Sequence, residues 1–219
     1  MRDRSAPLSE ADITSLDWEK MDGLLPALVK DRRTGQVLML GYMNSEALAG
    51  TLGTGLATFY SRSNQRLWQK GETSGNRLRV HRVFADCDDD ALLVLADPEG
   101  PTCHLGTQSC FGGEPTGPGW LSELSDIISK RAGSGDATSY TRKLLDEGPE
   151  RIGKKIGEEG VEVALAGVGR DVEGCVEEVA DLLYHVAVLM EARGFSWDDV
   201  VALLKARHAK ASKDRTAVS

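Results

Sequence analysis

The stretch GGEPTGPGW, residues 112–120, separates two parts of the sequence that follow different patterns. Its four glycines and two prolines exclude a regular helix or strand. Before it, short apolar runs alternate with turns, and after it apolar residues recur at helical spacing. We therefore predict two domains, residues 1–114 and 115–219, with a linker at about 112–120.

The N-terminal part has the pattern of a small domain built mainly from strands. The sequence predicts strands at residues 24–30, 36–40, 56–61, 78–85 and 91–96. DRRTG, residues 31–35, is predicted to be the turn between the first two, and a short helix is predicted over 43–52 with Asn44 as its N-cap. The spacing indicates an antiparallel or mixed sheet, so we expect an α+β, mainly β, domain.

The C-terminal part is predicted to be an all-α helical bundle. Gly148 and Pro149 are expected to end one helix and begin the next, Asp171 to cap the fourth helix, and Ser196 with Asp199 to form a capping box for the last. The predicted helices cover residues 120–131, 139–147, 149–168, 172–193 and 196–210.

Composition and charge indicate an ordinary soluble globular protein. The 219 residues are 41% hydrophobic and 27% charged, which is ordinary for a globular protein. The net charge of -8 argues against nucleic acid or an anionic membrane as the main partner, so bound phosphates would require cations. Because no stretch resembles a signal peptide or a membrane span, we expect a cytoplasmic protein.

Three of the four cysteines are candidate metal ligands. Cys87, Cys103 and Cys110 lie close together in the sequence, and cytosolic cysteines are expected to be reduced. Three thiolates suit zinc and leave a fourth position for water, as catalytic zinc sites require. His104 is a candidate for proton transfer or for the fourth ligand. The alternative is that these are small buried residues without a metal.

The sequence ADCDDDALLVL, residues 85–95, gathers carboxylates beside one of these cysteines. If the segment is the end of a strand, alternation places Asp86, Asp88 and Asp90 on one side and Cys87 on the other. Carboxylate oxygens are ligands that magnesium prefers. The alternative is a solvated acidic turn.

A glycine-bounded loop is a candidate phosphate site. KGETSG, residues 70–75, combines backbone amides, hydroxyl groups and a cation. The alternative is an ordinary turn that contains glycine. The residues predicted to bind substrate here are Lys70, Glu72, Thr73, Ser74 and Gly75.

Paired carboxylates on two predicted helices form a second candidate metal site. Glu159 and Glu162 are three residues apart, as are Glu178 and Asp181, so the members of each pair lie on one helical face. If the pairs face each other across a bundle, they form a cage for magnesium that holds a polyphosphate. The alternative is two solvated helix faces.

Four other residues near these pairs have weaker predicted roles. Lys154 and Lys155 are predicted to contact phosphate. Tyr184 and His185 are expected to pack or to support the site.

The N-terminal part contains, in this order, the motifs GLLPALVKDRRTGQVLMLGYMN, TFYSRSNQRLWQKGETSGN, DCDDDALL and GPTCHLGTQSCF. Taken together, they resemble phosphoribosyl-AMP cyclohydrolase over roughly residues 17–111. The resemblance implies zinc on Cys87, Cys103 and Cys110, shared across a homodimer interface, and magnesium on Asp86, Asp88 and Asp90. Family members often have glycine at the position of Asp89.

The C-terminal motifs SYTRKLL, GKKIGEEGVEV and EEVADLLYH resemble phosphoribosyl-ATP pyrophosphohydrolase, an all-helical relative of the MazG-type nucleotide pyrophosphohydrolases. The resemblance covers residues 121 to about 208. The two families in this order imply a bifunctional enzyme of histidine biosynthesis. Its C-terminal domain is expected to hydrolyse phosphoribosyl-ATP to phosphoribosyl-AMP, and its N-terminal domain to open the adenine ring of that product.

Two other functions are compatible with the residues alone. A general nucleoside triphosphate pyrophosphatase with a structural zinc domain would hydrolyse ordinary triphosphates without opening a ring. A zinc-stabilised module joined to a helical dimerisation bundle would have no activity that depends on Glu159 or Asp181.

Overall fold

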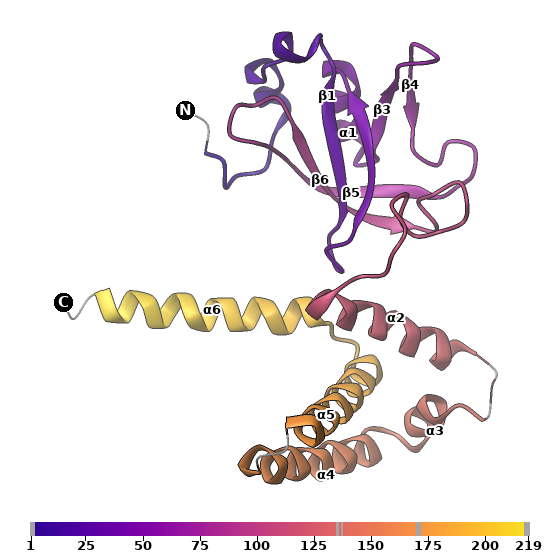
Figure 1. Ribbon diagram of the computed structural model, residues 1–219, viewed down its shortest axis with the longest axis vertical. Coiled ribbons are helices and arrows are strands. Elements are labelled where there is room, and N and C mark those ends of the chain that lie inside the picture. Colours follow the sequence, from indigo (N-terminus) through magenta and orange to yellow (C-terminus); the bar gives the residue numbers. More distant parts are fainter. Residues whose placement is uncertain (1–2, 135, 137, 170–171, 217–219) are drawn as a thin grey trace. The chain divides into compact units, whose positions relative to one another are not determined.

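The protein forms two compact units, Met1–Gly119 and Trp120–Ser219, and each is described by itself. The computed structural model describes residues 3–134, 136, 138–169 and 172–216 (Figure 1). The first unit is mainly β and the second is helical, as predicted. Within the described ranges, none of the helices combines the length and apolar character needed to cross a bilayer.

A mixed four-stranded sheet organises the first unit. β1 pairs with β6 in parallel, while the β1–β2 and β5–β6 pairs are antiparallel, so the prediction of an antiparallel or mixed sheet is confirmed. The strand order is β2-β1-β6-β5. The strands are β1 (Leu25–Asp31), β2 (Val37–Met43), β5 (Arg77–Ala85) and β6 (Leu92–Glu99).

One face of this sheet is buried because apolar residues alternate along its central strands. Leu25, Ala27 and Val29 are fully buried in β1, and Val94 is fully buried in β6. The predicted DRRTG turn is confirmed, since the buried Asp31 carboxylate accepts hydrogen bonds from the backbone N–H groups of the residues two and three positions later. The turn therefore fixes the C-terminal end of β1.

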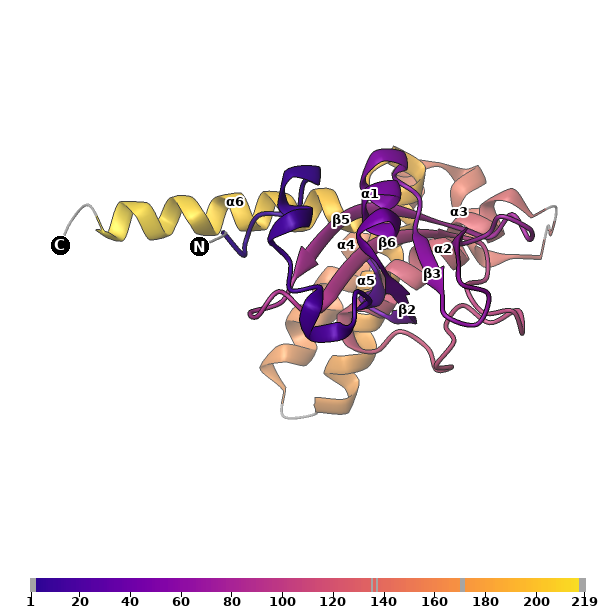
Figure 2. The same cartoon turned by 90° about the horizontal axis from the view of Figure 1, so that it is seen from above.

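A helix and a hairpin complete the first unit. α1 (Ser45–Thr54) packs against β3 (Thr58–Ser61) and the short helix η1 (Glu10–Ser15), and Figure 2 shows α1 beside β3. The Asn44 side chain accepts from the Ala47 N–H at 2.8 Å, so the predicted cap is confirmed. β4 (Arg66–Gln69) pairs with β3.

Strand β4 was not predicted. The segment has only four residues and is partly polar, and it forms a strand by pairing with β3.

The acidic segment after β5 corrects one prediction. β5 ends at Ala85 and β6 begins at Leu92, so residues 86–90, the acidic turn, form a connection and not a strand end. The Asp89 backbone has a φ of 58°, in the left-handed region. The strand alternation used to assign the directions of these side chains therefore does not apply, because alternation requires extended backbone.

In the residues that the structure describes, the second unit contains five helices. α4 and α5 pack along each other, α2 packs against α5, and α3 packs mainly against α4 and α2. The buried core comprises Ile128, Leu144, Ile152, Ala187 and Val188. The helices are α2 (Trp120–Gly133), α3 (Tyr140–Glu147), α4 (Pro149–Val168), α5 (Val172–Arg193) and α6 (Trp197–Thr216).

Local sequence determines where these helices begin and end. Gly148, with a φ of 88°, ends α3, and Pro149 begins α4, as predicted. The Ser196 backbone N–H and hydroxyl both donate to the Asp199 carboxylate at the start of α6. Asp171, the predicted cap of α5, lies outside the described residues.

The last helix is anchored mainly at its start. The Trp197 side chain packs against the core, and its Nε1–H donates to the Leu121 carbonyl at 3.1 Å. Farther along, Leu203 and Leu204 are more than half exposed. Most of α6 therefore extends from the other helices of the second unit.

We predict that two glycines of the KGETSG loop differ in their tolerance of a side chain. Both have positive φ, 85° at Gly71 and 78° at Gly75, so alanine at either costs about 1–2 kcal/mol. A Cβ at Gly71 would also lie 2.6 Å from the Asn76 backbone, while at Gly75 it meets open space. Gly71→Ala should therefore lower the free energy of unfolding more than Gly75→Ala, measured by urea denaturation. Equal losses would contradict the predicted backbone clash.

Candidate active sites

Two of the three predicted zinc ligands lie together in the first unit. The thiols of Cys103 and Cys110 are close enough to interact, and the loop that holds them is fixed by the Cys110 N–H, which donates to the Leu38 carbonyl at 2.8 Å. A hydrogen bond from the Leu105 backbone N–H is the main cause that lowers the pKa of Cys103 below the ordinary thiol value. Partial desolvation raises the pKa of Cys110, and charge on Cys103 adds to this rise.

His104, which was predicted to act near the thiols, and Lys70, which was predicted for the phosphate loop, both lie near the cysteine pair. The Lys70 ammonium also lowers the pKa of both Cys103 and Cys110, so the start of the KGETSG loop faces the cysteine pair. The exposed His104 places its Nδ1 3.9 Å from the Cys103 sulfur. The structure therefore brings together Lys70, His104 and two cysteines.

Cys87 does not join the cysteine pair within one chain. The three cysteine sulfurs do not form a set with all ligand atoms within 4.8 Å of one another, whereas three aspartates in the same described region do. The exposed Cys87 thiol instead lies 3.7 Å from Oδ1 of Asp88, on the side of the carboxylates. The prediction that Cys87 faces away from the aspartates is wrong, because residues 86–90 form a turn.

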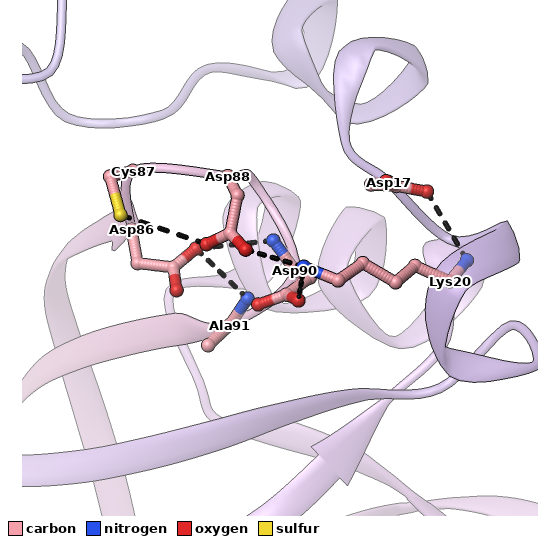
Figure 3. Close-up of polar contacts among 7 residues, drawn as sticks. All are labelled: Asp17, Lys20, Asp86, Cys87, Asp88, Asp90 and Ala91. Atoms are coloured by element: carbon pink, nitrogen blue, oxygen red, sulfur yellow. Dashed lines mark hydrogen bonds and ion pairs between the residues drawn. The ribbon is translucent and has the colours of Figure 1, made fainter.

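The three alternating aspartates converge even though the strand argument fails. Asp86, Asp88 and Asp90 each offer an oxygen within 4.8 Å of the others. The Asp86 carboxylate accepts from the backbone N–H groups of Asp90 and Ala91, at 3.1 and 3.2 Å (Figure 3). Turn geometry therefore produces the cluster that strand alternation was expected to produce.

A lysine from a distant segment contacts two of these aspartates. The Lys20 ammonium, on η2 (Glu19–Met21), pairs with the carboxylates of Asp88 and Asp90 (Figure 3). These hydrogen bonds, first with Asp88 and then with Asp90, raise the pKa of Lys20 well above its ordinary value. Sequence reasoning missed Lys20 because 68 residues separate it from Asp88.

The KGETSG loop borders a small polar cavity of about 240 Å³, lined by Ser61, Asn64, Arg66, Trp68 and Glu72. Glu72 pairs with Arg66 at 2.7 Å, and this contact lowers the pKa of the Glu72 carboxyl. Ser74 accepts a hydrogen bond from the Asn76 N–H. The carboxylate of Glu72 is thus engaged in bracing the loop.

In the second unit, the two predicted carboxylate pairs meet between α4 and α5. Glu159, Glu178 and Asp181 offer oxygens within 4.8 Å of one another. A hydrogen bond with Glu159 is the main cause that raises the pKa of Glu162, and the charge of Glu178 adds to it. All four predicted residues therefore form one carboxylate cluster: Glu159, Glu162, Glu178 and Asp181.

Two residues flank Glu159, which is only 5% exposed. The Lys155 ammonium lies 2.8 Å from Glu158 and 3.6 Å from Glu159. On the other side, Nδ1 of the buried His185 lies 3.6 Å from Glu159. A buried carboxylate is costly without such partners, so both residues support the position of Glu159.

His185 and Tyr184, which were expected to pack or to support the site, belong to a hydrogen-bond network beside Glu159. Nδ1 of His185 lies 2.9 Å from the Asp181 carbonyl, and its Nε2 lies 3.3 Å from the Tyr140 hydroxyl. Tyr184 shares a hydrogen bond with Thr141 at 2.9 Å. Lys154 lies near Glu158, since its charge helps to lower the pKa of that carboxyl. The network links α3, α4 and α5 around Glu159.

Comparison with protein families assigns each unit. Residues 39–112 match the family model described as phosphoribosyl-AMP cyclohydrolase. Residues 121–208 match the family model described as phosphoribosyl-ATP pyrophosphohydrolase. The acidic turn and the cysteine pair lie in the first match, and the carboxylate cluster lies in the second.

Curated relatives carry both units in one chain. Proteins named histidine biosynthesis bifunctional protein HisIE are 55% identical over 197 residues in Xanthomonas campestris, 48% over 205 residues in Shewanella oneidensis and 48% over 203 residues in Yersinia pestis. These alignments cover 90%, 94% and 93% of this chain, and 94%, 97% and 100% of the relatives.

The raised pKa of Glu162 predicts how stability depends on pH. When the pKa of a carboxyl is raised in the folded state, its ionisation destabilises the fold. This penalty is absent below the ordinary glutamate pKa, grows as the pH rises towards the raised pKa, and is complete above it. In the presence of chelator, Glu178→Gln should therefore slow hydrogen exchange of the α4 and α5 amides at neutral pH, with the difference vanishing in acid. Glu177→Gln, which removes an exposed charge on the same helix, is the control. Equal effects of the two variants would contradict the prediction.

Proposed function

Because this chain belongs to the bifunctional histidine-biosynthesis family that joins a phosphoribosyl-AMP cyclohydrolase to a phosphoribosyl-ATP pyrophosphohydrolase, we propose which of its residues serve each reaction. The C-terminal domain hydrolyses phosphoribosyl-ATP to phosphoribosyl-AMP and pyrophosphate. The N-terminal domain then opens the adenine ring of phosphoribosyl-AMP by hydrolysis. Both substrates are small molecules of the histidine pathway.

In the C-terminal domain, the carboxylate cluster is the proposed magnesium site. The observation that carries this proposal is the convergence of oxygens from Glu159, Glu178 and Asp181 within 4.8 Å, from two different helices. Hard oxygen donors at this spacing fit Mg²⁺. Glu162 completes the set, because the hydrogen bond with Glu159 and the charge of Glu178 both raise its pKa, and a divalent cation would relieve this crowding of carboxylates.

Basic residues beside this cluster are proposed to hold the phosphates. Lys155 is anchored between Glu158 and Glu159, so its ammonium stays next to the metal ligands. Lys154 is exposed and adds positive charge one residue away. Together they offset the negative charge of a triphosphate, which a protein with net charge -8 would otherwise repel.

In the N-terminal domain, Cys87, Cys103 and Cys110 are the proposed zinc ligands. Hydrogen bonding to Cys103 and the nearby Lys70 charge favour the thiolate form that zinc requires. The separation of Cys87 from the cysteine pair supports a site that is completed by a second chain. Asp86, Asp88 and Asp90 are the proposed ligands of a magnesium ion, since their oxygens converge in the same way as the C-terminal cluster.

The remaining N-terminal residues are assigned to substrate binding and proton transfer. The proposed phosphate-binding groups are Lys70, Thr73, Ser74 and the backbone of Gly75, while Glu72 braces the loop through Arg66. His104 directs Nδ1 towards Cys103, which leaves Nε2 to accept the proton of the attacking water. When bound, magnesium would neutralise phosphate charge, and zinc would activate water near neutral pH.

A homodimer is the proposed assembly. Besides the separated cysteines, the α4 and α5 helices expose apolar side chains at their adjoining ends: Leu165, Val168 and Val172 are 70%, 88% and 74% exposed. An exposed apolar stripe of this kind is typical of a surface that associates. Each domain therefore contains a feature that supports a dimer: the separated cysteines in the first and the exposed apolar side chains in the second.

The two reactions should be separable by single substitutions. With phosphoribosyl-ATP as substrate, Cys103→Ala should release pyrophosphate but accumulate phosphoribosyl-AMP, because the zinc site loses a ligand. Glu159→Gln should block pyrophosphate release but still open the ring of added phosphoribosyl-AMP. Chromatography of the products measures both steps. Ring opening by Cys103→Ala at the normal rate, or hydrolysis of ordinary triphosphates in place of phosphoribosyl-ATP, would contradict the assignment.

A zinc site shared between chains should be restored by mixing defective chains. Cys87→Ala and Cys110→Ala chains each lack a ligand, but a mixed dimer rebuilds one of its two sites. Denaturing and refolding an equal mixture should therefore recover about a quarter of the normal zinc content, read by mass spectrometry of metals. The two variants refolded separately are the controls. If mixing recovers no zinc, the ligands come from a single chain.

A further inference from the structure

Lys20 lies against the acidic turn although it comes from a distant segment of the N-terminal domain. Its ammonium contacts the carboxylates of Asp88 and Asp90, two of the three proposed magnesium ligands (Figure 3). The lysine precedes residue 39, where the match to the cyclohydrolase family model begins. A positive side chain thus reaches into the set of oxygens that would bind a cation.

The position of Lys20 is fixed by its backbone as well as by its side chain. The Lys20 N–H donates to the Asp17 carboxylate at 3.2 Å, and the Asp17 N–H donates to the Asp89 carbonyl at 2.9 Å. Asp89 is the residue of the acidic turn that has left-handed backbone. The segment that carries Lys20 is therefore hydrogen-bonded directly to the turn that it neutralises.

The three aspartates are held by different partners. Asp86 is oriented by the backbone N–H groups of Asp90 and Ala91, which would remain in place if a cation bound to its other oxygen. Asp88 and Asp90 are held by the Lys20 ammonium. A divalent cation that uses all three carboxylates would therefore retain the first arrangement and compete with the second.

We propose that Lys20 acts as a built-in counter-cation of the acidic turn, which keeps Asp88 and Asp90 together when no metal is bound and must move away when a divalent cation binds. This inference rests on the proposed magnesium site of the N-terminal domain. Lys20 thereby weakens divalent-cation binding and stabilises the metal-free turn. The long, exposed side chain of Lys20 allows this movement without a change in the fold.

Lys20 is proposed to lower the affinity for divalent cations and to raise the stability of the metal-free turn. These opposite effects distinguish this role from a purely structural one. Removing a unit charge about 5 Å from a divalent cation in a solvent-exposed site should tighten cation binding by about tenfold. The same substitution leaves three carboxylates in mutual repulsion, so the metal-free N-terminal domain should become less stable. A residue that only shaped the turn would lower both stability and affinity.

The test measures Mn²⁺, as a probe for Mg²⁺, bound to the full-length chain. Glu178→Gln and Asp181→Asn are present in every protein, so that the C-terminal cluster does not contribute. Lys20→Met should bind Mn²⁺ about tenfold more tightly at low ionic strength, as measured by the electron paramagnetic resonance signal of free Mn²⁺. The gain should shrink in high salt, because exposed charges are screened. Without metal, Lys20→Met should show faster hydrogen exchange of β5 and β6 amides.

Two lysine variants serve as matched controls. Lys20→Arg keeps the charge and should bind Mn²⁺ about as the parent protein does. Lys30→Met removes the same charge from β1, where the residue pairs with Leu95 farther along β6 from the turn, and should change affinity little. Asp88→Asn should abolish Mn²⁺ binding, which shows that the acidic turn is the site being measured. If it does, unchanged or weaker binding by Lys20→Met, or equal tightening by Lys30→Met, would overturn the inference. If Asp88→Asn leaves binding intact, the proposed magnesium site itself is wrong and the inference falls with it.

Discussion

Repulsion between carboxylates held close together is the constraint on which both sites of this protein depend. Asp86, Asp88 and Asp90 meet in one turn, and Glu159, Glu178 and Asp181 meet between two helices, each set with oxygens within 4.8 Å. Such groups oppose folding unless a positive charge or a hydrogen-bond donor lies among them. The chain carries a net charge of -8, so this compensation must be local.

The two domains compensate in different ways, and the difference follows from burial. In the exposed acidic turn, backbone N–H groups hold Asp86, and the Lys20 ammonium pairs with the other two carboxylates. In the helical domain, Glu159 is nearly inaccessible and lies between Lys155 and the buried His185. A hydrated turn can exchange one cation for another, whereas a buried carboxylate needs fixed partners on neighbouring helices.

The sequence predicted what depends on local periodicity and missed what depends on contacts between distant segments. The predicted ranges 149–168 and 172–193 coincide with α4 and α5, because the helical period and the Gly148–Pro149 boundary lie in adjacent residues. The aspartates and glutamates of each cluster were also identified, although the strand argument for the turn failed once Asp89 adopted left-handed backbone. Lys20 and the contact of His185 with Glu159 were not identified, since sequence spacing does not show which helix or loop packs alongside.

The position of Cys87 adds a constraint on how the proposed N-terminal metals act together. Its thiol lies 3.7 Å from the Asp88 carboxylate, so one short turn presents a soft and a hard donor side by side. A charge placed on either donor acts on the other over a short distance, and at such a separation unit charges interact by about 1–4 kcal/mol in a hydrated or surface site. A cation bound in the acidic turn would therefore act electrostatically on the proposed zinc ligand Cys87, and two divalent cations held this close would repel each other. On this argument the two proposed N-terminal sites are coupled through one short turn, in which the ammonium of Lys20 supplies positive charge when no metal is bound.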